Sequence, residues 1–304
     1  MRNKWFVSLL MVVVMMCACW TGALAEDEER ETFTSGDYEY ALLDDGTVEI
    51  AGYKGSADLL AIPAELDGKT VTAIGDSAFF FCFSLTSVSI PDSVEQIGAN
   101  PFRTCSALKT ISVSPEHPYF ATIDGVLFRK ADKTLISYPA GINSSTYTIP
   151  QGITAIGDSV FSFCSSLTSV SIPDSVEQIG ANPFGNCSAL KTISVSPEHP
   201  YFATIDDVLL RKADKTLISY PKGIKSSTYT IPQGIASIGD RAFSWCFSLT
   251  SVSIPDSVTS IGDSAFSFCP NLTLTVPRNS YAAEYAKTNN ISYTYPDAND
   301  WLNN

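Results

Sequence analysis

The sequence predicts a right-handed, β-rich solenoid built on a parallel sheet, with hairpin insertions and a short C-terminal capping helix. Three observations indicate this fold class: a tandem duplication, a shorter period inside each copy, and segments that alternate apolar and polar residues. Residues 90–171 recur as residues 172–253, and the two 82-residue units differ at 12 positions. Repetition of this kind is typical of arrays in which each unit packs against its neighbours.

The shorter period is 23 residues and follows the motif V-x-x-I-G-x-x-x-F-x-x-C-x-x-L-x-x-V-x-I-P. The end of the motif alternates as a strand with one buried face does, so we expect Leu85, Val88 and Ile90 to point inward. The motif glycine suits a turn with positive φ or a close backbone approach. The copies open at Val71, Val94, Ile153, Val176, Ile235 and Val258. Their phenylalanines, which should stack as a spine, are Phe79, Phe102, Phe161, Phe184, Phe243 and Phe266.

The remaining elements follow in chain order. Residues 38–50 should form a hairpin about Asp45-Gly46, which is a favourable turn pair. Residues 120–138 of the first unit predict an inserted hairpin, after which residues 146–150 should rejoin the same sheet. We expect a signal peptide over 1–25, an N-terminal hairpin cap over 26–70, the solenoid over 71–276 with its units at 90–171 and 172–253, and a C-terminal cap and tail over 277–304.

One parallel sheet of nine strands should run through the whole solenoid. With neighbouring strands about 4.8 Å apart, eight gaps give a sheet about 38 Å wide. The expected strands end at Ile62, Ile90, Val113, Ile149, Ile172, Val195, Ile231, Ile254 and Val276.

The amino terminus has the pattern of a secretory signal. Arg2 and Lys4 precede an apolar run over residues 6–20, and small residues lead to an expected cleavage after Ala25. A membrane anchor is the alternative, but the run is short for a span. A lipoprotein attached through Cys19 is a further alternative. We therefore expect a secreted or cell-surface chain with no membrane span after processing.

Composition restricts the partners. The 304 residues carry a formal net charge of −13, which repels phosphate backbones and anionic lipids, so nucleic acid is not an expected partner. Two histidines leave little material for general base catalysis or metal ligation. We expect a monomer without cofactor, metal or catalytic residues.

Six cysteines each lie 11 residues after a motif opening. Export and an even count favour disulfides, but identical spacing favours one buried thiol per coil. A reduced ladder is the preferred interpretation, with oxidised neighbouring pairs or a metal site as alternatives. These residues are Cys82, Cys105, Cys164, Cys187, Cys246 and Cys269.

Other polar residues recur with the repeats and therefore indicate turns rather than a unique site. His117 and His199 are one position seen twice, whereas a catalytic histidine would be expected once. The recurring aspartates, which we assign to turns and caps, are Asp76, Asp92, Asp158, Asp174, Asp240, Asp256 and Asp263.

Two surfaces are candidates for binding. The first is the outward face of the strands, where a solvated face without a ligand is the alternative. Its candidate contact residues are Thr86, Ser87, Ser89, Lys109, Thr110, Ser112, Thr168, Lys191 and Thr250. The second is a set of aromatic residues beside the cysteines, which could instead cover neighbouring coils. Its members are Phe81, Phe163, Trp245 and Phe268, with Phe83 and Phe247 just beyond.

These motifs resemble the BspA-like leucine-rich repeat family over roughly residues 36–295. The resemblance rests on Ile172-Pro173, Val176, Ile179-Gly180, Phe184, Cys187 and Leu190 and on the same pattern in the other copies. Two copies depart from it with Pro101 and Pro183 before the phenylalanine, and Asp207 replaces Gly125 at a turn. The resemblance implies a leucine-rich repeat solenoid in an exported microbial surface protein, several relatives of which act as adhesins.

The function expected from this resemblance is a non-catalytic protein-binding module. The leading hypothesis is an adhesin for host matrix or cell-surface proteins. A structural or spacer module of the cell envelope is the alternative, and an enzyme with an unrecognised site is a third class.

Overall fold

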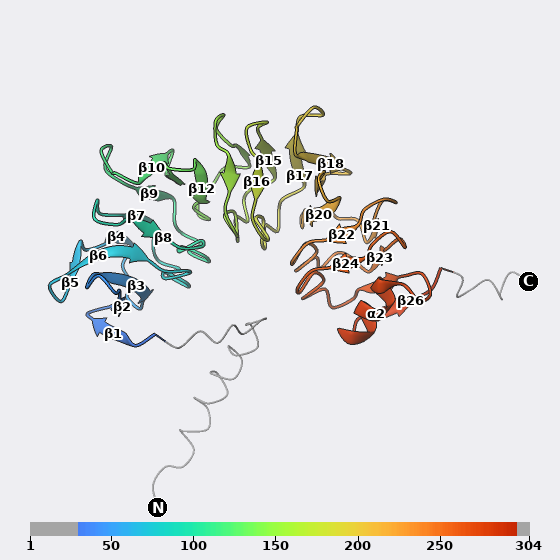
Figure 1. The fold of residues 1–304 in the computed structure, drawn as a ribbon, viewed down its shortest axis with the longest axis horizontal. Helices are drawn as coiled ribbons and strands as arrows, with labels where there is room; N and C mark the ends of the chain where they lie inside the picture. Colours follow the sequence, from blue (N-terminus) through green and yellow to red (C-terminus); the bar gives the residue numbers. More distant parts are fainter. Residues whose placement is uncertain (1–29, 297–304) are drawn as a thin grey trace, which may run out of the picture. The chain divides into compact units, whose positions relative to one another are not determined.

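The computed structural model describes residues 30–296, which from Thr32 onward form one compact unit. Successive coils of this unit follow one another in chain order, and their short strands form several separate sheets along the chain (Figure 1). The predicted solenoid with hairpin insertions and a short helix is confirmed. The expected signal segment, its cleavage after Ala25 and the alternative at Cys19 lie outside the described residues.

Antiparallel strands open the described part of the chain. β1 (Thr32–Ser35), β2 (Tyr38–Leu42) and β3 (Val48–Tyr53) pair in order. The β2–β3 turn falls at Asp45-Gly46 as predicted, with Gly46 at a φ of 83°. β3 then pairs in parallel with β6 (Lys69–Ile74), which also pairs with the short antiparallel β5 (Glu65–Leu66). The hairpin therefore covers the first edge of the solenoid.

One series of parallel strands carries the alternating Ser and Thr residues, and we call it the hydroxyl series. Leu85, Val88 and Ile90 are buried in and beside its second strand, which confirms the predicted inward set. The series comprises β4 (Leu59–Ala61), β7 (Ser87–Ser89), β9 (Thr110–Ser112), β13 (Thr146–Thr148), β15 (Ser169–Ile172), β17 (Thr192–Val195), β21 (Thr228–Thr230), β23 (Ser251–Ser253), β25 (Thr273–Thr275) and β26 (Ser292–Thr294).

The prediction of one nine-stranded sheet is wrong. The hydroxyl series forms three separate sheets, β4-β7-β9, β13-β15-β17 and β21-β23-β25-β26, so the strands before Ile90 and Ile149 do not share a sheet. The insertion is the cause, because its turn occupies the place beside β9, where Ile111 N–H donates to the Gly125 carbonyl at 3.0 Å. Asp207 keeps the same left-handed turn in the second unit, with a φ of 63° against 79° at Gly125.

A second parallel series contains the Ile-Gly part of the motif, and apart from residues 134–137 of the inserted hairpin it was not predicted as strands. Most of its strands are two residues long, too short to show a period. At the following turn a Cβ on Gly98 would lie 2.1 Å from Asp76 Oδ1, so close approach is what requires that glycine. Besides β6, this isoleucine series comprises β8 (Gln96–Ile97), β12 (Thr134–Ser137), β14 (Ala155–Ile156), β16 (Gln178–Ile179), β20 (Thr216–Ser219), β22 (Ser237–Ile238) and β24 (Ser260–Ile261).

The insertions contain three strands rather than the two of a simple hairpin. β10 (Phe120–Ile123) and β11 (Val126–Arg129) precede β12, and β18 (Phe202–Ile205) and β19 (Val208–Arg211) precede β20. Both faces of the insertion are buried. Leu127 and Ile136 pack in the core of the preceding coils, whereas Val126, Phe128 and Leu135 pack in the core of the following ones. The insertion therefore joins two hydrophobic cores.

The predicted aromatic spine is confirmed. Phe79 and Phe102 stack with their ring centroids 5.2 Å apart, and the corresponding pairs of the later coils stack at 5.2 and 5.0 Å. A tyrosine precedes each pair, and these residues are Tyr53, Tyr138 and Tyr220. Each core therefore contains a stack of three rings.

The carboxyl end is closed by the predicted helix, α2 (Tyr281–Thr288). Ser280 accepts a hydrogen bond from Ala283 N–H at 3.1 Å and so caps the helix. Ala282 and Ala286 are fully buried against the last core. β26 follows the helix and pairs with β25, a strand beyond those predicted.

Candidate functional site

Three threonines of the predicted strand-face site hold the coils together. The hydroxyl groups of Thr86, Thr168 and Thr250 donate to the carbonyls of Asp58, Ser145 and Ser227 in the preceding coil, at 2.8, 2.8 and 3.1 Å. A side chain engaged in this way is a stacking contact first. Ser112 does the same with the Val88 carbonyl at 3.2 Å.

The other strand-face candidates remain accessible but do not form one surface. Lys109 and Lys191 are exposed, as are Ser89 and Thr110, and Ser87 is half-buried. Ser87, Ser89 and Thr110 lie in the β4-β7-β9 sheet, with Lys109 directly before β9, whereas Lys191 directly precedes β17 of the next sheet. The flat, continuous face that we expected is interrupted by the insertions.

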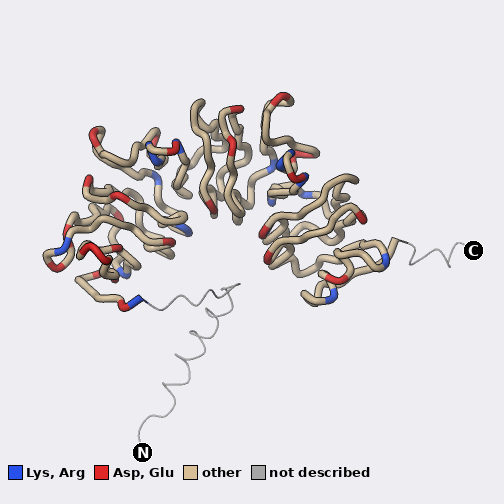
Figure 2. The backbone as a smooth tube through the Cα atoms, in the orientation of Figure 1, with Lys and Arg blue, Asp and Glu red and all other residues tan. Residues whose placement is uncertain are grey.

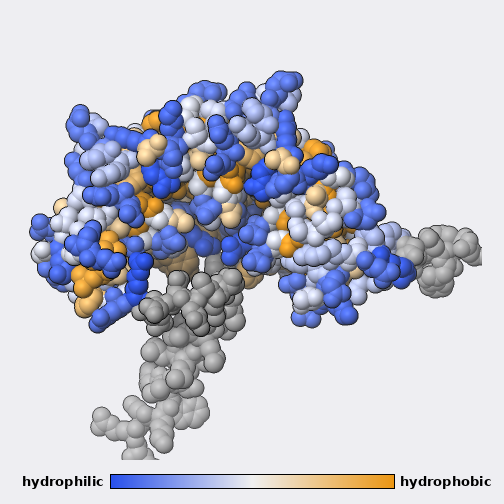
Figure 3. All heavy atoms as spheres, in the orientation of Figure 1, coloured by the Kyte–Doolittle hydropathy of each residue, from blue (hydrophilic) through white to orange (hydrophobic). Residues whose placement is uncertain are grey.

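The aromatic candidates lie at the corners of the coils. We call the set Phe81, Phe83, Phe163, Trp245, Phe247 and Phe268 the aromatic stripe. Phe81, Phe83, Phe247 and Phe268 are 54%, 58%, 57% and 46% exposed, whereas Phe163 and Trp245 are half-buried. In the view of Figure 3, apolar surface lies in patches among hydrophilic residues.

Four residues of the stripe are held in a costly backbone conformation. Phe81, Phe163, Trp245 and Phe268 have φ values of 67°, 65°, 63° and 57°. A bulky residue in this left-handed region is an outlier that costs on the order of 1–3 kcal/mol. The same slot of the repeat holds Thr104 at 67° and Asn186 at 56°, so the turn adopts this conformation in all six copies, and asparagine is a residue type that tolerates it well. The fold alone therefore does not require an aromatic side chain there.

The rings of the stripe form two clusters. Phe81 contacts Phe80 and Phe83, with centroids 3.8 and 5.4 Å apart. At the other end, Trp245 stacks on Phe268 at 4.3 Å and meets Phe247 edge-on at 5.7 Å. Each cluster is therefore a preformed, partly exposed apolar surface.

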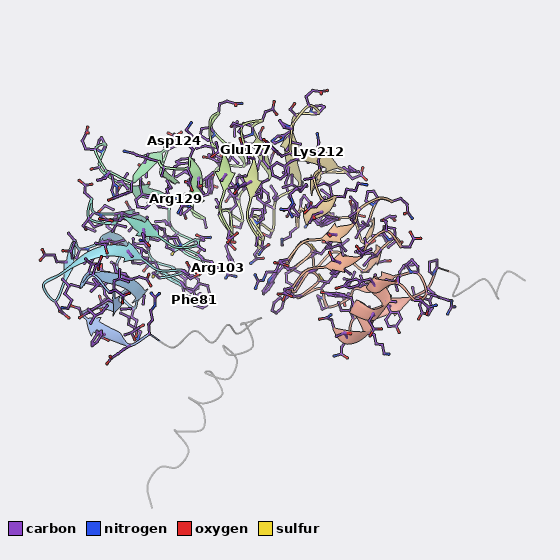
Figure 4. The ribbon with its side chains drawn as sticks, viewed as in Figure 1. Phe81, Arg103, Asp124, Arg129, Glu177 and Lys212 are labelled. Carbon is purple, nitrogen blue, oxygen red and sulfur yellow. The ribbon has the colours of Figure 1, made fainter. Side chains whose placement is uncertain are left out.

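An arginine that sequence reasoning missed links the stripe across coils. The Arg103 guanidinium lies over the rings of Phe80 and Phe163, 5.7 and 6.0 Å from their centroids. Figure 4 shows Arg103 beside Phe81 of the preceding coil. Burial, together with the charge of Arg241, lowers the pKa of Arg103 from its ordinary value. The stripe is thus a mixed aromatic and cationic surface.

A comparison of the two units could have indicated Arg103. Five of their 12 differences fall on or beside the stripe, whereas the core residues of the motif are almost unchanged. These pairs are Arg103/Gly185, Thr104/Asn186, Ser159/Arg241, Phe163/Trp245 and Ser165/Phe247.

The recurring histidines and aspartates serve the fold, as predicted. His117 is fully buried, and its Nδ1 accepts from the N–H groups of Tyr119 and Phe120 at 3.2 and 3.3 Å. Asp76 Oδ1 accepts from Ala99 N–H at 2.6 Å and ties one coil to the next. Within residues 30–296, no three His, Cys, Asp or Glu side chains gather in a way that could hold a metal ion.

The six described cysteines are free thiols, one at the same position in each coil. Cys105 and Cys187 donate to the carbonyls of Phe79 and Phe161 at 3.1 and 2.8 Å. Burial raises the pKa of the Cys246 thiol to about 12, which keeps it protonated and a poor nucleophile.

Thiol titration of the denatured, secreted protein should find most of these six cysteines free, and a reductant should barely change the melting temperature. The reason is that five of the thiols are buried and Cys269 is half-buried, and each has a carbonyl acceptor. A drop of several degrees on reduction would instead reveal native disulfides, each typically worth about 2–4 kcal/mol.

Acidic residues outnumber basic ones along the coils, as Figure 2 shows. None of the helices in the described part of the chain has the length and apolar character needed to cross a bilayer.

A stack of short coils with two strand series, a phenylalanine spine and exposed corner residues defines a leucine-rich repeat solenoid. Leucine-rich repeats are a protein-interaction fold. The chain belongs to the BspA type leucine rich repeat family, whose model matches six copies over residues 65–145 and 218–292.

Solved structures of bacterial proteins are similar to this chain. A leucine rich cell surface protein from Faecalibacterium prausnitzii is 29% identical, with 82% of this chain and 76% of that chain covered and a TM-score of 0.39. Leucine-rich repeat proteins from Bacteroides ovatus and Eubacterium ventriosum are 26% and 20% identical. They cover 80% and 82% of this chain and 70% and 73% of their own, with TM-scores of 0.37 and 0.48. No curated protein sequence matches the chain.

Proposed function

We propose that this protein is an exported, non-catalytic surface module that binds host matrix or cell-surface proteins through its aromatic stripe. The observation that carries the proposal is the backbone strain at Phe81, Phe163, Trp245 and Phe268. Backbone strain retained at accessible positions, where Phe81 and Phe268 are exposed and Phe163 and Trp245 half-buried, is typical of functional sites. Aromatic residues and arginine are also the side chains most enriched at the energetic centres of protein interfaces.

The stripe is favoured over the strand face for two physical reasons. The hydroxyl groups of Thr86, Thr168 and Thr250 are already bonded to neighbouring coils. The stripe rings, in contrast, bring large apolar area at a low cost in side-chain entropy. Several such contacts along the repeats would give affinity in the micromolar range through their number.

Retention of the protein at the cell surface is part of the proposal. The apolar amino-terminal run and the acidic mature chain support export, and the family resemblance supports a surface location. The secreted protein would then present its stripe outside the cell without an enzymatic reaction.

Replacing Phe81 and Trp245 by asparagine should weaken binding to an immobilised matrix protein at least 10-fold without loss of stability. Asparagine occupies the equivalent slot at Asn186, so the turn is retained and its strain is reduced. The measurement is binding of wild type and Phe81→Asn/Trp245→Asn to a panel of matrix and cell-surface proteins, with melting temperatures as the fold control.

A strand-face variant is the matched comparison. It carries Thr86→Glu, Lys109→Glu, Thr168→Glu, Lys191→Glu and Thr250→Glu. Because three of these threonines also bond to the preceding coil, only loss of binding in this variant alone, at an unchanged melting temperature, would move the site to the strand face. No binding by the wild type to any panel member would contradict the adhesin proposal and favour the spacer function.

A further inference from the structure

Two grooves recur at the places where an insertion meets the coils before it, and we call them the junction grooves. The first has a volume of about 420 Å³ and is lined by Gly98, Ala99, Asn100, Arg129, Thr134 and Ile136, among others. The second has a volume of about 260 Å³ and is lined by Gly180, Ala181, Asn182, Arg211, Thr216 and Ile218. Each residue of the second set lies 82 positions after its counterpart, so the chain contains the same site twice.

Each groove borders an open sheet edge. Within the described residues, β8 pairs only with β6, and β16 pairs only with β14. The strand that comes next in the isoleucine series, β12 or β20, belongs to a different sheet, where it pairs with β11 and β14 or with β19 and β22. β8 and β16 are therefore edge strands, and the unpaired side of each faces a groove.

The hydrogen-bonding pattern inside a coil pair indicates what these edges offer. The carbonyls of Thr72 and Ile74 accept from the N–H groups of Glu95 and Gly98 in the next coil, at 2.7 and 2.8 Å. One period later, the carbonyls of Glu95 and Ile97 take the same positions on β8 but face the junction. Glu177 and Ile179 occupy these positions on β16. Each groove thus presents backbone acceptors that a strand could satisfy.

The charged groups at the grooves are arranged in the same way in both. Arg129 is paired with Asp132 and Arg211 with Asp214, at 3.0 and 2.9 Å. Asp158 lines the first groove and Asp240 the second. One oxygen of each accepts a backbone hydrogen bond, from Ala181 N–H at 2.6 Å and from Asp263 N–H at 2.8 Å, and neither carboxylate forms an ion pair with a described residue. Figure 4 labels Arg129, the last residue of β11, and Glu177, which directly precedes β16. An incoming ligand therefore meets uncompensated negative charge.

We propose that each junction groove binds an extended, basic peptide segment, which adds as a strand beside β8 or β16. Its backbone N–H groups donate to the open carbonyls, as in other cases of strand addition. A lysine or arginine side chain of the segment pairs with Asp158 or Asp240. The net charge of −13 favours the approach of such a segment. This site is separate from the aromatic stripe, so either proposal can fail without the other.

The test uses the full mature chain and a short capped peptide of alternating threonine and lysine with a fluorescent label. Titration followed by anisotropy and calorimetry should give two peptides per chain. The same peptide with its backbone nitrogens methylated keeps its charge but loses its donors, and it should bind at least 10-fold more weakly. Equal binding of the two peptides would show simple charge attraction and overturn the proposal.

Variants locate the site. Ala99 and Ala181 are exposed residues of the two grooves, so Ala99→Phe or Ala181→Phe should reduce the stoichiometry to one, and the double variant should abolish binding. Glu284→Phe is the control, because Glu284 is an exposed residue of α2 and no residue of that helix lines either groove.

The remaining outcomes are decisive as well. Asp158→Asn/Asp240→Asn should weaken the lysine peptide but not a threonine-only peptide. Phe81→Asn/Trp245→Asn should leave peptide binding unchanged, which separates this site from the stripe. No peptide binding at millimolar concentration, or an unchanged stoichiometry in the Ala99→Phe/Ala181→Phe variant, would overturn the proposal.

Discussion

Phe161→Ala should lower the free energy of unfolding by about 3–5 kcal/mol, the usual cost of removing a fully buried phenylalanine ring. Phe161 has no exposed surface and stacks between Tyr138 and Phe184, with centroids 5.3 and 5.2 Å away. The Phe161 carbonyl also accepts a hydrogen bond from the Cys187 thiol. The cavity would open between two coils, so both should lose packing.

Phe163→Ala is the matched control, because the two phenylalanines lie two residues apart in one coil. The Phe163 ring belongs to the aromatic stripe, and alanine would keep the same left-handed backbone conformation. Removal of the Phe163 ring should lower the free energy of unfolding by less than about 1 kcal/mol. Urea unfolding followed by circular dichroism measures both. Similar losses in the two variants would mean that the spine does not carry the stability that its burial implies.

Stability should also fall when the pH drops below about 6.5, because two histidines are buried in the neutral form. Burial lowers the pKa of His117 and His199 from the ordinary value of 6.5. Each Nε2 lies 3.1 Å from a proline carbonyl, whereas each Nδ1 accepts from backbone N–H groups and cannot do so once protonated. Lys130 and Lys212 add positive charge nearby, and Asp92 and Asp174 oppose their effect.

The sign follows from proton linkage. The unfolded chain binds a proton at each histidine near pH 6.5, whereas the folded chain resists it, so the contribution is complete above that pH and is lost below it. Each unit of pKa difference corresponds to about 1.4 kcal/mol per histidine, and the chain has two. Carboxylates with lowered pKa, such as Asp132 and Asp214, lose their contributions only below about pH 4.

Urea unfolding at a series of pH values between about 7.5 and 5 measures this effect. His117→Gln/His199→Gln should be less stable at neutral pH but should lose the slope across this range, since glutamine does not titrate. A slope that persists in the double variant would assign the pH dependence to other groups.

The sequence predicted most of the coil and little of how coils are joined. The 23-residue period placed Leu85, Val88 and the phenylalanine spine correctly, because each buried position is filled by the same kind of apolar residue in every coil. The sheet breaks were missed, since nothing local shows that the Asp124-Gly125 turn would take the position beside β9. One signal existed: residues 134–137 lack alternation, and a strand buried on both faces belongs between two cores.

The candidate site was predicted in part for a similar reason. The stripe phenylalanines could be noticed because they fill positions that the motif leaves free. Their left-handed backbone could not be predicted, because aromatic residues almost never occupy that region. Arg103 gave no periodic signal, since the second unit has Gly185 there.

The insertions also bear on how such a chain can change its length. Each one buries one face in the core behind it and the other in the core ahead, and the first insertion has a near-identical copy 82 residues later. The surface at the carboxyl end of one unit therefore fits the surface at the amino end of the next. Unequal recombination between the two gene segments would delete or add a whole unit without creating a new packing problem. Lineages should accordingly differ in copy number, and every added unit would bring one more junction groove and one more pair of corner residues.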